Sequence, residues 1–155
     1  MTKRSAVHAT FVIDRTYDAA PARVFKAFAD PASKRRWFHG PEEWGPAQHE
    51  MDFRVGGKEI SIGGPPGGTR HAYRAMFQDI VPDERIVSTY DMDLDGVRIS
   101  VSLATLELRP DGAGTRLIYT EQGVYLDGYD DAGAREHGTR ELFNALGASL
   151  EHETV

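Results

Sequence analysis

The chain has 155 residues, no cysteine and a formal net charge of −6 at pH 7. The absence of cysteine excludes disulfides, thiolate catalysis and cysteine-based metal sites, and the acidic balance disfavours nucleic acid, which requires a basic surface. No apolar run approaches the roughly 20 residues of a membrane span, so we expect one globular domain over residues 1–155, in the cytoplasm and without membrane insertion.

A strand followed by two short helices is expected at the start of the chain. Between Ala6 and Tyr17 apolar and polar residues alternate, which predicts a half-buried strand. Pro21 suits the first turn of a helix, because the N–H group that proline lacks would be unpaired there. Asp30 and Pro31 repeat this signal, with Asp30 as the cap of a second short helix.

Strands separated by glycine and proline turns are expected in the middle of the chain. Gly56-Gly57 and Asp95-Gly96 are hairpin signals between apolar runs. Residues 39–48 combine prolines and glycines and are expected to form a loop. The predicted strands cover residues 50–55, 58–62, 70–81, 85–92, 97–108 and 115–124.

A long amphipathic helix of about 20 residues is predicted at the end of the chain. Asp130 or Asp131 is expected to cap it. Its apolar positions are Leu142, Phe143, Leu146 and Leu150. A strand-rich middle followed by one long helix indicates an α+β fold in which a bent antiparallel sheet of about seven strands wraps around the helix. Such an arrangement often leaves a cavity between the sheet and the helix.

Several short motifs, taken in their order and spacing, resemble one superfamily. Near the start they are Asp18-Ala19-Ala20-Pro21, Asp30-Pro31 and Arg36-Trp37-Phe38, and further on they are residues 52–57, 79–85, 114–117 and 136–150. Together they resemble the START-like, or SRPBCC, superfamily over about residues 8–152. The branch they resemble most is named after the activator of the heat-shock-protein-90 ATPase. The resemblance implies the helix-grip fold, with two short helices after the first strand, and a ligand cavity.

This resemblance implies a fold rather than one chemistry, since members bind lipids or natural products, cyclise polyketides or assist chaperones. We expect first a protein that binds a small hydrophobic or amphipathic molecule in the cavity. The alternative is an enzyme like the polyketide cyclases and aromatases, and a third reading is a co-chaperone-like interaction module. No cofactor is expected, and a homodimer is a further hypothesis.

Glu59 and Glu121 are the candidate catalytic residues of the enzyme alternative, because each interrupts an apolar strand. A carboxylate that faces a dry pocket has a raised pKa and can act as an acid or a base. The competing interpretation is an edge acid paired in solvent with Lys58, Arg74 or Arg98. Aromatic residues are expected to line the cavity, where tyrosine hydroxyls supply polar groups. The predicted ligand-binding residues are Trp37, Phe38, Trp44, Glu59, Tyr73, Phe77, Tyr90, Ser102, Tyr119, Glu121, Thr139 and Phe143.

Small polar side chains are expected to leave part of this cavity unfilled. Many relatives carry tryptophan where this chain has Thr139, so the resemblance implies a larger or wetter pocket here. Ser100 and Ser102 add small polar positions on a central strand.

The sequence offers no metal site with the required spacing. The alternating aspartates from Asp91 to Asp95, followed by a glycine, resemble the start of a calcium loop. However, Ser102 stands at the twelfth position, where such a loop needs a bidentate acid. The 6 histidines form no metal-binding pair. We therefore expect no metal and no binding of micromolar calcium.

Overall fold

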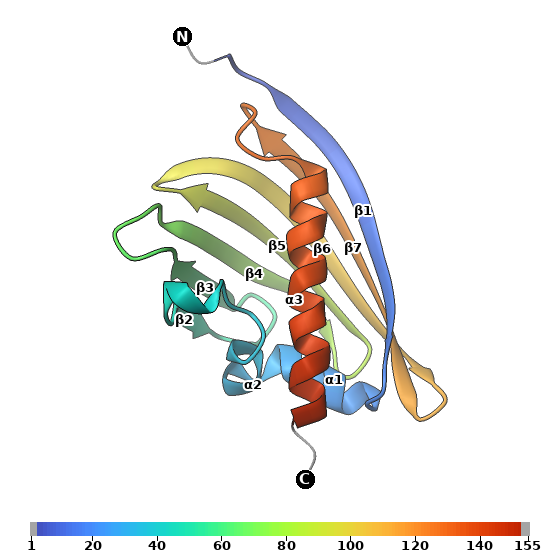
Figure 1. The fold of residues 1–155 in the computed structure, drawn as a ribbon. Coiled ribbons are helices and arrows are strands. Elements are labelled where there is room, and N and C mark those ends of the chain that lie inside the picture. The colour runs from blue at the N-terminus through green and yellow to red at the C-terminus, as the bar shows by residue number, and fades with distance from the viewer. Residues whose placement is uncertain (1–2, 153–155) are drawn as a thin grey trace.

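The computed structural model describes residues 3–152, and within them seven antiparallel strands form one sheet that curves around the long helix α3 (Figure 1). The strands are β1 (Ala6–Tyr17), β2 (Gln48–Met51), β3 (Lys58–Gly63), β4 (His71–Val81), β5 (Arg85–Leu94), β6 (Val97–Asp111) and β7 (Gly114–Leu126). The helices are α1 (Pro21–Ala29), α2 (Pro31–Arg35), the 3-10 helix η1 (Glu42–Trp44) and α3 (Ala132–His152). The predicted α+β helix-grip fold is confirmed.

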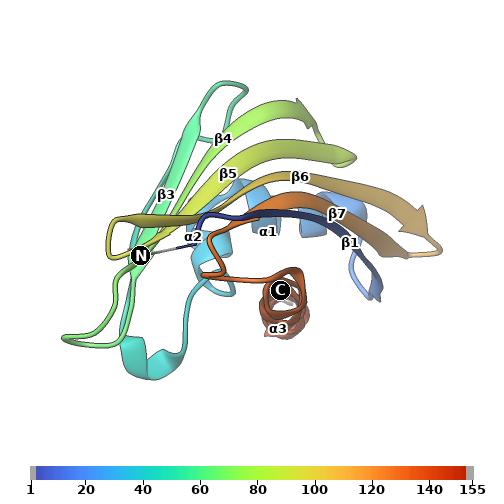
Figure 2. The same ribbon diagram turned by 90° about the horizontal axis from the view of Figure 1, so that it is seen from above.

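The order of the strands in the sheet is β1-β7-β6-β5-β4-β3-β2, so the first strand pairs with the last. β1 and β7 are in register along their whole length, from Ala6 opposite Leu126 to Tyr17 opposite Thr115. Helix α3 runs inside the curve of the sheet, and α1 and α2 lie near one end of it (Figure 2). The concave face is thus covered by α3 over β1 and β7 and by a loop over β3 and β4.

Local sequence signals account for the two short helices. Pro21 and Pro31 each occupy the first position of their helix, where a missing N–H group leaves no hydrogen bond unmade. The carboxylate of Asp30 accepts hydrogen bonds from the amide and hydroxyl groups of Ser33. This cap begins α2 directly after α1 ends.

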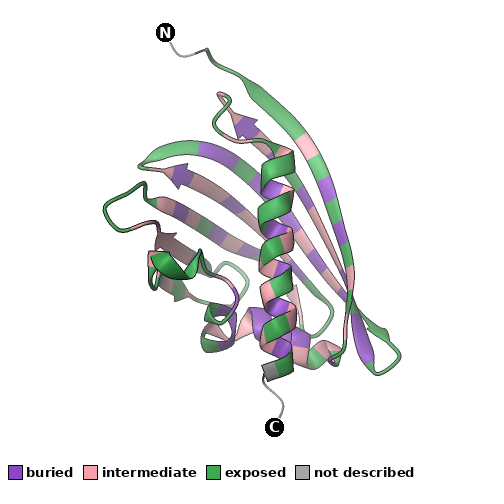
Figure 3. Cartoon of the chain, in the orientation of Figure 1, coloured by how far each residue is buried: buried purple, intermediate pink, exposed green. Residues whose placement is uncertain are grey.

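Helix α3 is capped by Asp131, whose carboxylate accepts a hydrogen bond from the amide of Ala134 at 2.9 Å. On its sheet side Phe143, Leu146 and Leu150 are buried. Figure 3 shows this buried stripe alternating with exposed turns along the helix. The predicted length, cap and apolar face of the helix are confirmed.

The alternation of β1 is confirmed only in its second half. Phe11 and Ile13 are buried as expected, but Val7, which is in the same phase, is 59% exposed. The start of β1 extends beyond the elements that cover the concave face, as the exposed end of the strand shows (Figure 3). Alternation therefore predicts which face a side chain takes, while burial depends on what covers that face.

The predicted hairpin at Gly56-Gly57 is wrong in its bounds, because β2 covers only Gln48–Met51. The backbone of Gly56 and Gly57 instead exchanges two hydrogen bonds with Phe77 in β4. A Cβ atom at Gly57 would lie 2.0 Å from the carbonyl oxygen of Asp52. The second glycine thus allows a tight loop that closes onto β4.

Candidate functional site

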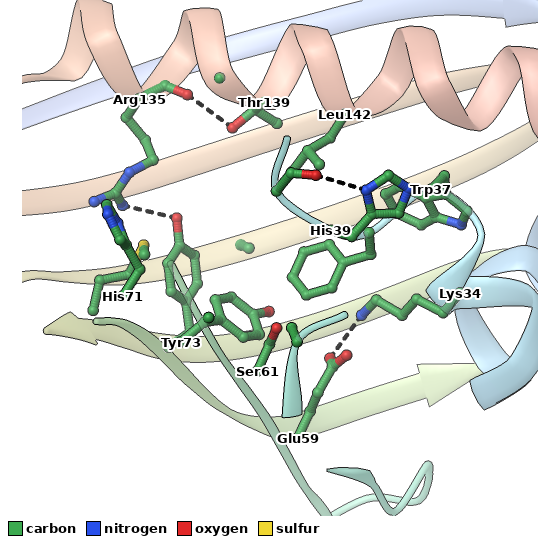
Figure 4. A pocket seen from close by; sticks show the side chains of 18 of the residues that line it. Lys34, Trp37, His39, Glu59, Ser61, His71, Tyr73, Arg135, Thr139 and Leu142 are labelled. Carbon is green, nitrogen blue, oxygen red and sulfur yellow. Dashed lines mark hydrogen bonds and ion pairs between the residues drawn. The ribbon is translucent and has the colours of Figure 1, made fainter. Parts of the chain in front are cut away.

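A cavity of about 550 Å3 lies between the concave face of the sheet, α3 and the loop that follows α2 (Figure 4). Most of its lining is apolar or aromatic, and polar side chains enter it from α2, β3, β4, β5 and α3. The volume falls within the range of ligand sites in proteins.

Most of the side chains predicted to bind a ligand line this cavity. They are Trp37, Phe38, Trp44, Glu59, Tyr73, Phe77, Tyr90, Tyr119, Thr139 and Phe143. Ser102 and Glu121 are buried but do not line it. The hydroxyl groups of Tyr90 and Tyr119, which do line the cavity, lie against the Glu121 carboxylate.

The cavity has a closed end and an open end. Trp37 and Tyr119 both pack against Phe143, with ring centroids 6.3 and 5.3 Å apart, and these three rings form one wall of the closed end. Exposed lining residues from loop 39–47, the β7–α3 connection and α3 mark the opening. There the indole of Trp44 lies 4.8 Å from the ring of His71.

Glu59 belongs to a cluster that we call the Glu59 cluster, formed by the buried side chains of Lys34, His49 and Glu59 and by the exposed Arg35. The Lys34 ammonium donates a hydrogen bond to one carboxylate oxygen of Glu59 at 2.6 Å, and Nε2 of His49 lies 2.8 Å from the other. Nε of Arg35 donates to Nδ1 of His49 at 2.9 Å. Because Nδ1 accepts this bond, the proton of the imidazole is on Nε2 and is donated to Glu59.

The Glu59 cluster reverses the expectation of a raised pKa for this carboxyl group. Burial alone raises the pKa of Glu59, but the charge of Lys34 and the hydrogen bonds from His49 and Lys34 lower it, and the net result lies below the ordinary value. The edge-acid alternative is also wrong, since the Glu59 carboxylate is fully buried and its partner is Lys34. An ionised Glu59 with both oxygens occupied is poorly suited to abstract a proton from a ligand.

Glu121 lies behind the wall of the cavity and is bonded by hydroxyl groups. Its carboxylate accepts hydrogen bonds from Tyr90 at 2.8 Å, Tyr119 at 2.6 Å and Ser102 at 3.3 Å. The strand phase was predicted correctly, since Glu121 faces the same side as Tyr119. The two tyrosine side chains line the cavity and separate it from the carboxylate.

Arg135 is the cation beside Glu121, and its side chain lines the cavity from α3. Its guanidinium donates to the Tyr90 hydroxyl at 2.9 Å, to the Ser100 hydroxyl at 2.7 Å and to the Asp130 carboxylate at 2.9 Å, and lies 3.6 Å from Glu121. Burial by itself lowers the pKa of Arg135, but Tyr90, Glu121 and Asp130 together raise it above its ordinary value. Arg135 therefore stays charged and holds the polar side chains around it in place.

Four hydroxyl groups that line the cavity have no hydrogen-bond partner among residues 3–152: those of Ser61, Tyr73, Ser88 and Tyr129. Ser61 and Tyr73 face each other across β3 and β4. In Figure 4 they lie between the Lys34–Glu59 pair and Arg135. Burial raises the pKa of Tyr73 well above its ordinary value, and the charge of Glu59 adds to the effect, so the phenol keeps its proton.

Lys34, His49 and Arg135 are not among the site residues predicted from the sequence. Arg135 stands four residues before Thr139, so helical spacing places both on one face of α3, and this signal was available. Lys34 and His49 lie 25 and 10 residues from Glu59 along the chain. No spacing rule connects them, because the curve of the sheet brings them together.

The described part of the chain contains no group of three or more His, Asp or Glu side chains that could hold a metal ion. Asp93 is held by Arg74 at 2.7 Å, and Arg98 lies 3.6 Å from Asp91. These aspartates therefore already have cationic partners. Among residues 3–152 no helix is long and apolar enough to cross a membrane.

Residues 18–151 match the family model described as activator of Hsp90 ATPase homolog 1-like protein. The chain belongs to this family. Membership in the Hsp90 ATPase activator homologue family confirms the resemblance drawn from the motifs. No curated protein matches the chain.

Solved structures of similar proteins share the fold of this family member. An uncharacterised protein of Rhizobium leguminosarum is 45% identical with a TM-score of 0.93, over 98% of this chain and 100% of its own. The Mll3558 protein of Rhizobium loti is 52% identical with a TM-score of 0.87, over 94% of this chain and 99% of its own. The CV1439 protein of Chromobacterium violaceum is 27% identical with a TM-score of 0.77, over 92% of this chain and 96% of its own.

Proposed function

We propose that this protein binds a small hydrophobic or amphipathic molecule in the cavity between the sheet and α3. The observation that carries the proposal is a cavity of about 550 Å3 with a mainly apolar lining and a few converging polar groups. A site of this kind excludes water from most of a ligand's surface and orients the ligand through few hydrogen bonds. The membership in a family with the helix-grip fold is consistent with it.

The cyclase-like alternative has less support from the geometry. Both oxygens of Glu59 are bonded to cationic or N–H groups, and Glu121 lies behind Tyr90 and Tyr119. A general base must come within hydrogen-bond distance of the proton it removes. Neither carboxylate is free to do so from its present position.

The proposal is tested by filling the cavity with a side chain. Thr139 lines the cavity and bonds only the carbonyl of Arg135 one turn earlier in the helix. Thr139→Trp adds a large ring at this point of the cavity. Ala148→Trp is the matched control, because Ala148 lies on an exposed position of the same helix.

Binding is measured with Nile red, an uncharged dye whose fluorescence rises in apolar surroundings. We expect saturable binding by the wild type and by Ala148→Trp, with similar Kd values. Thr139→Trp should weaken binding at least about tenfold, or about 1.4 kcal/mol, while circular dichroism shows an unchanged fold. The proposal fails if the wild type does not bind, or if folded Thr139→Trp binds as tightly as Ala148→Trp.

A further inference from the structure

The charges around the cavity cancel within the protein itself. Lys34 is paired with Glu59, and Arg135 lies beside both Glu121 and Asp130. Asp130 is the one carboxylate in excess. With 21% of its side chain accessible, it is more exposed than Glu59 and Glu121. The enclosed part of the site is therefore close to neutral.

The cavity keeps hydrogen-bond donors that no protein group among residues 3–152 uses. The Lys34 ammonium carries three N–H groups, and Glu59 takes one of them. The hydroxyl groups of Ser61, Tyr73 and Ser88 have no partner among residues 3–152. Both oxygens of Glu59, by contrast, already accept a bond. Ser61, Tyr73 and Ser88 are each only partly buried, so a ligand acceptor that replaces water in the cavity can take hydrogen bonds from these hydroxyl groups and from Lys34.

We propose that the ligand is an uncharged amphipathic molecule with a carbonyl oxygen, or another neutral oxygen acceptor, that binds between Lys34 and Tyr73. This inference rests on the proposed function and specifies the class of ligand. The acceptor oxygen takes bonds from the Lys34 ammonium and the Tyr73 hydroxyl, with Ser61 beside it (Figure 4). The apolar body lies against the side chains of β5, β6 and α3, where Ile86, Leu106 and Leu142 line the cavity.

A charged ligand is disfavoured because it would bring an unpaired charge into this balanced site. A carboxylate would compete with Glu59 for Lys34, and one of the two anions would be left without a cation. An ammonium group would find Glu59 and Glu121 already paired, and Asp130, the carboxylate in excess, is already bonded by Arg135. Burying an unpaired charge costs several kcal/mol, whereas a neutral carbonyl group replaces its bonds to water with bonds to Lys34 and Tyr73.

The charge preference is tested with three probes of equal chain length: 2-undecanone, undecanoic acid and undecylamine. At neutral pH the first is uncharged, the second anionic and the third cationic. The affinity of each probe is measured by its displacement of Nile red from the wild-type protein. Thermal shift measures the direct binding of each probe. We expect the ketone to bind at least about tenfold more tightly than either charged probe. Equal or tighter binding of the acid or the amine would overturn the inference while leaving the proposed function intact.

The position of the acceptor is tested by removing single hydroxyl groups. Tyr73→Phe deletes a cavity hydroxyl that has no partner within residues 3–152. Tyr125→Phe is the matched control, because its buried hydroxyl also lacks a partner there but does not line the cavity. We expect Tyr73→Phe to weaken 2-undecanone binding about tenfold, and Tyr125→Phe to leave it within about twofold of the wild type. Nile red binding should survive in both variants.

The outcomes separate the inference from the function on which it rests. If Nile red and all three probes fail to bind, the proposed function is wrong and the inference falls with it. If Nile red binds and Tyr73→Phe binds the ketone as tightly as the wild type does, only the position of the acceptor between Lys34 and Tyr73 is refuted.

Discussion

Glu59 and Glu121 are both about 1% exposed, and each lies beside a cation on a different element. Burying a charge is costly unless a partner and hydrogen bonds compensate for it. Lys34 supplies the compensation for Glu59 from α2, and Arg135 supplies it for Glu121 from α3. At the scale of single residues, the two ion pairs therefore connect the helices to the sheet around the cavity.

The Glu59 cluster predicts how stability depends on pH. Because the folded-state pKa of Glu59 lies below its ordinary value of 4.5, its ionised form favours folding. This contribution is fully present above about pH 4.5 and is lost as the pH falls through the lower folded-state pKa. Glu59→Gln should lose less stability than the wild type between pH 5 and pH 3.

Urea denaturation at a series of pH values measures this difference. Glu84→Gln serves as the control, because Glu84 is an exposed acid in the β4–β5 turn, and it should follow the wild-type pH profile. An identical acid profile for Glu59→Gln and the wild type would contradict the prediction.

Arg135→Met should lower the free energy of unfolding by roughly 3–5 kcal/mol, because it leaves the Glu121 charge buried without a cation. The double variant Arg135→Met/Glu121→Leu should recover more than half of that loss, since it removes both charges. Chemical denaturation of the two variants measures the recovery. A loss below about 1 kcal/mol in the single variant would show that hydroxyl groups alone stabilise Glu121.

At the scale of elements, α3 carries glycines in two different surroundings. A Cβ atom at Gly138 would meet nothing within 4 Å, whereas at Gly147 it would lie 3.2 Å from the ring of Tyr17. The Tyr17 ring cannot move freely, because its hydroxyl donates to the carbonyl of Phe143 at 2.8 Å. The first glycine leaves the cavity open, and the second allows the helix to approach β1.

This difference predicts different effects on stability for the same substitution at the two glycines. Gly138→Ala should raise the free energy of unfolding by about 0.5–1 kcal/mol, the usual gain in a helix interior. Gly147→Ala should gain clearly less or lose stability, because the helix must shift away from Tyr17. Thermal and urea denaturation measure both. An equal gain in the two variants would contradict the close packing at Gly147.

At the scale of the whole molecule, one sheet and one long helix share a single main core, which predicts one unfolding unit over the described residues 3–152. Trp37 is 2% exposed in this core, and Trp44 is half-buried at the opening of the cavity. Urea unfolding followed by tryptophan fluorescence and by far-UV circular dichroism should therefore give coincident two-state transitions. Two separated transitions would contradict the single-domain prediction.

Local sequence patterns predicted the order of the long strands and of the three α-helices, but not the 3-10 helix η1 or the bounds of β2. Alternation of apolar residues predicted the long strands, Pro21 and Asp30 the two short helices, and the apolar stripe up to Leu150 the last helix. These signals are local, because each depends on residues a few positions apart. For the same reason the sequence placed most of the aromatic residues on the correct face of their strands.

Only the tertiary structure decided the electrostatics of the cavity. Lys34 reaches Glu59 from a different element, and Arg135 reaches Tyr90 across 45 positions of the chain. The direction of the pKa shift of Glu59 and the separation of Glu121 from the cavity depend on these distant partners. Burial alone would have raised the pKa of Glu59, and its partners reverse the direction. Pairing between distant residues follows from the curvature of the sheet, which no local pattern in the sequence encodes.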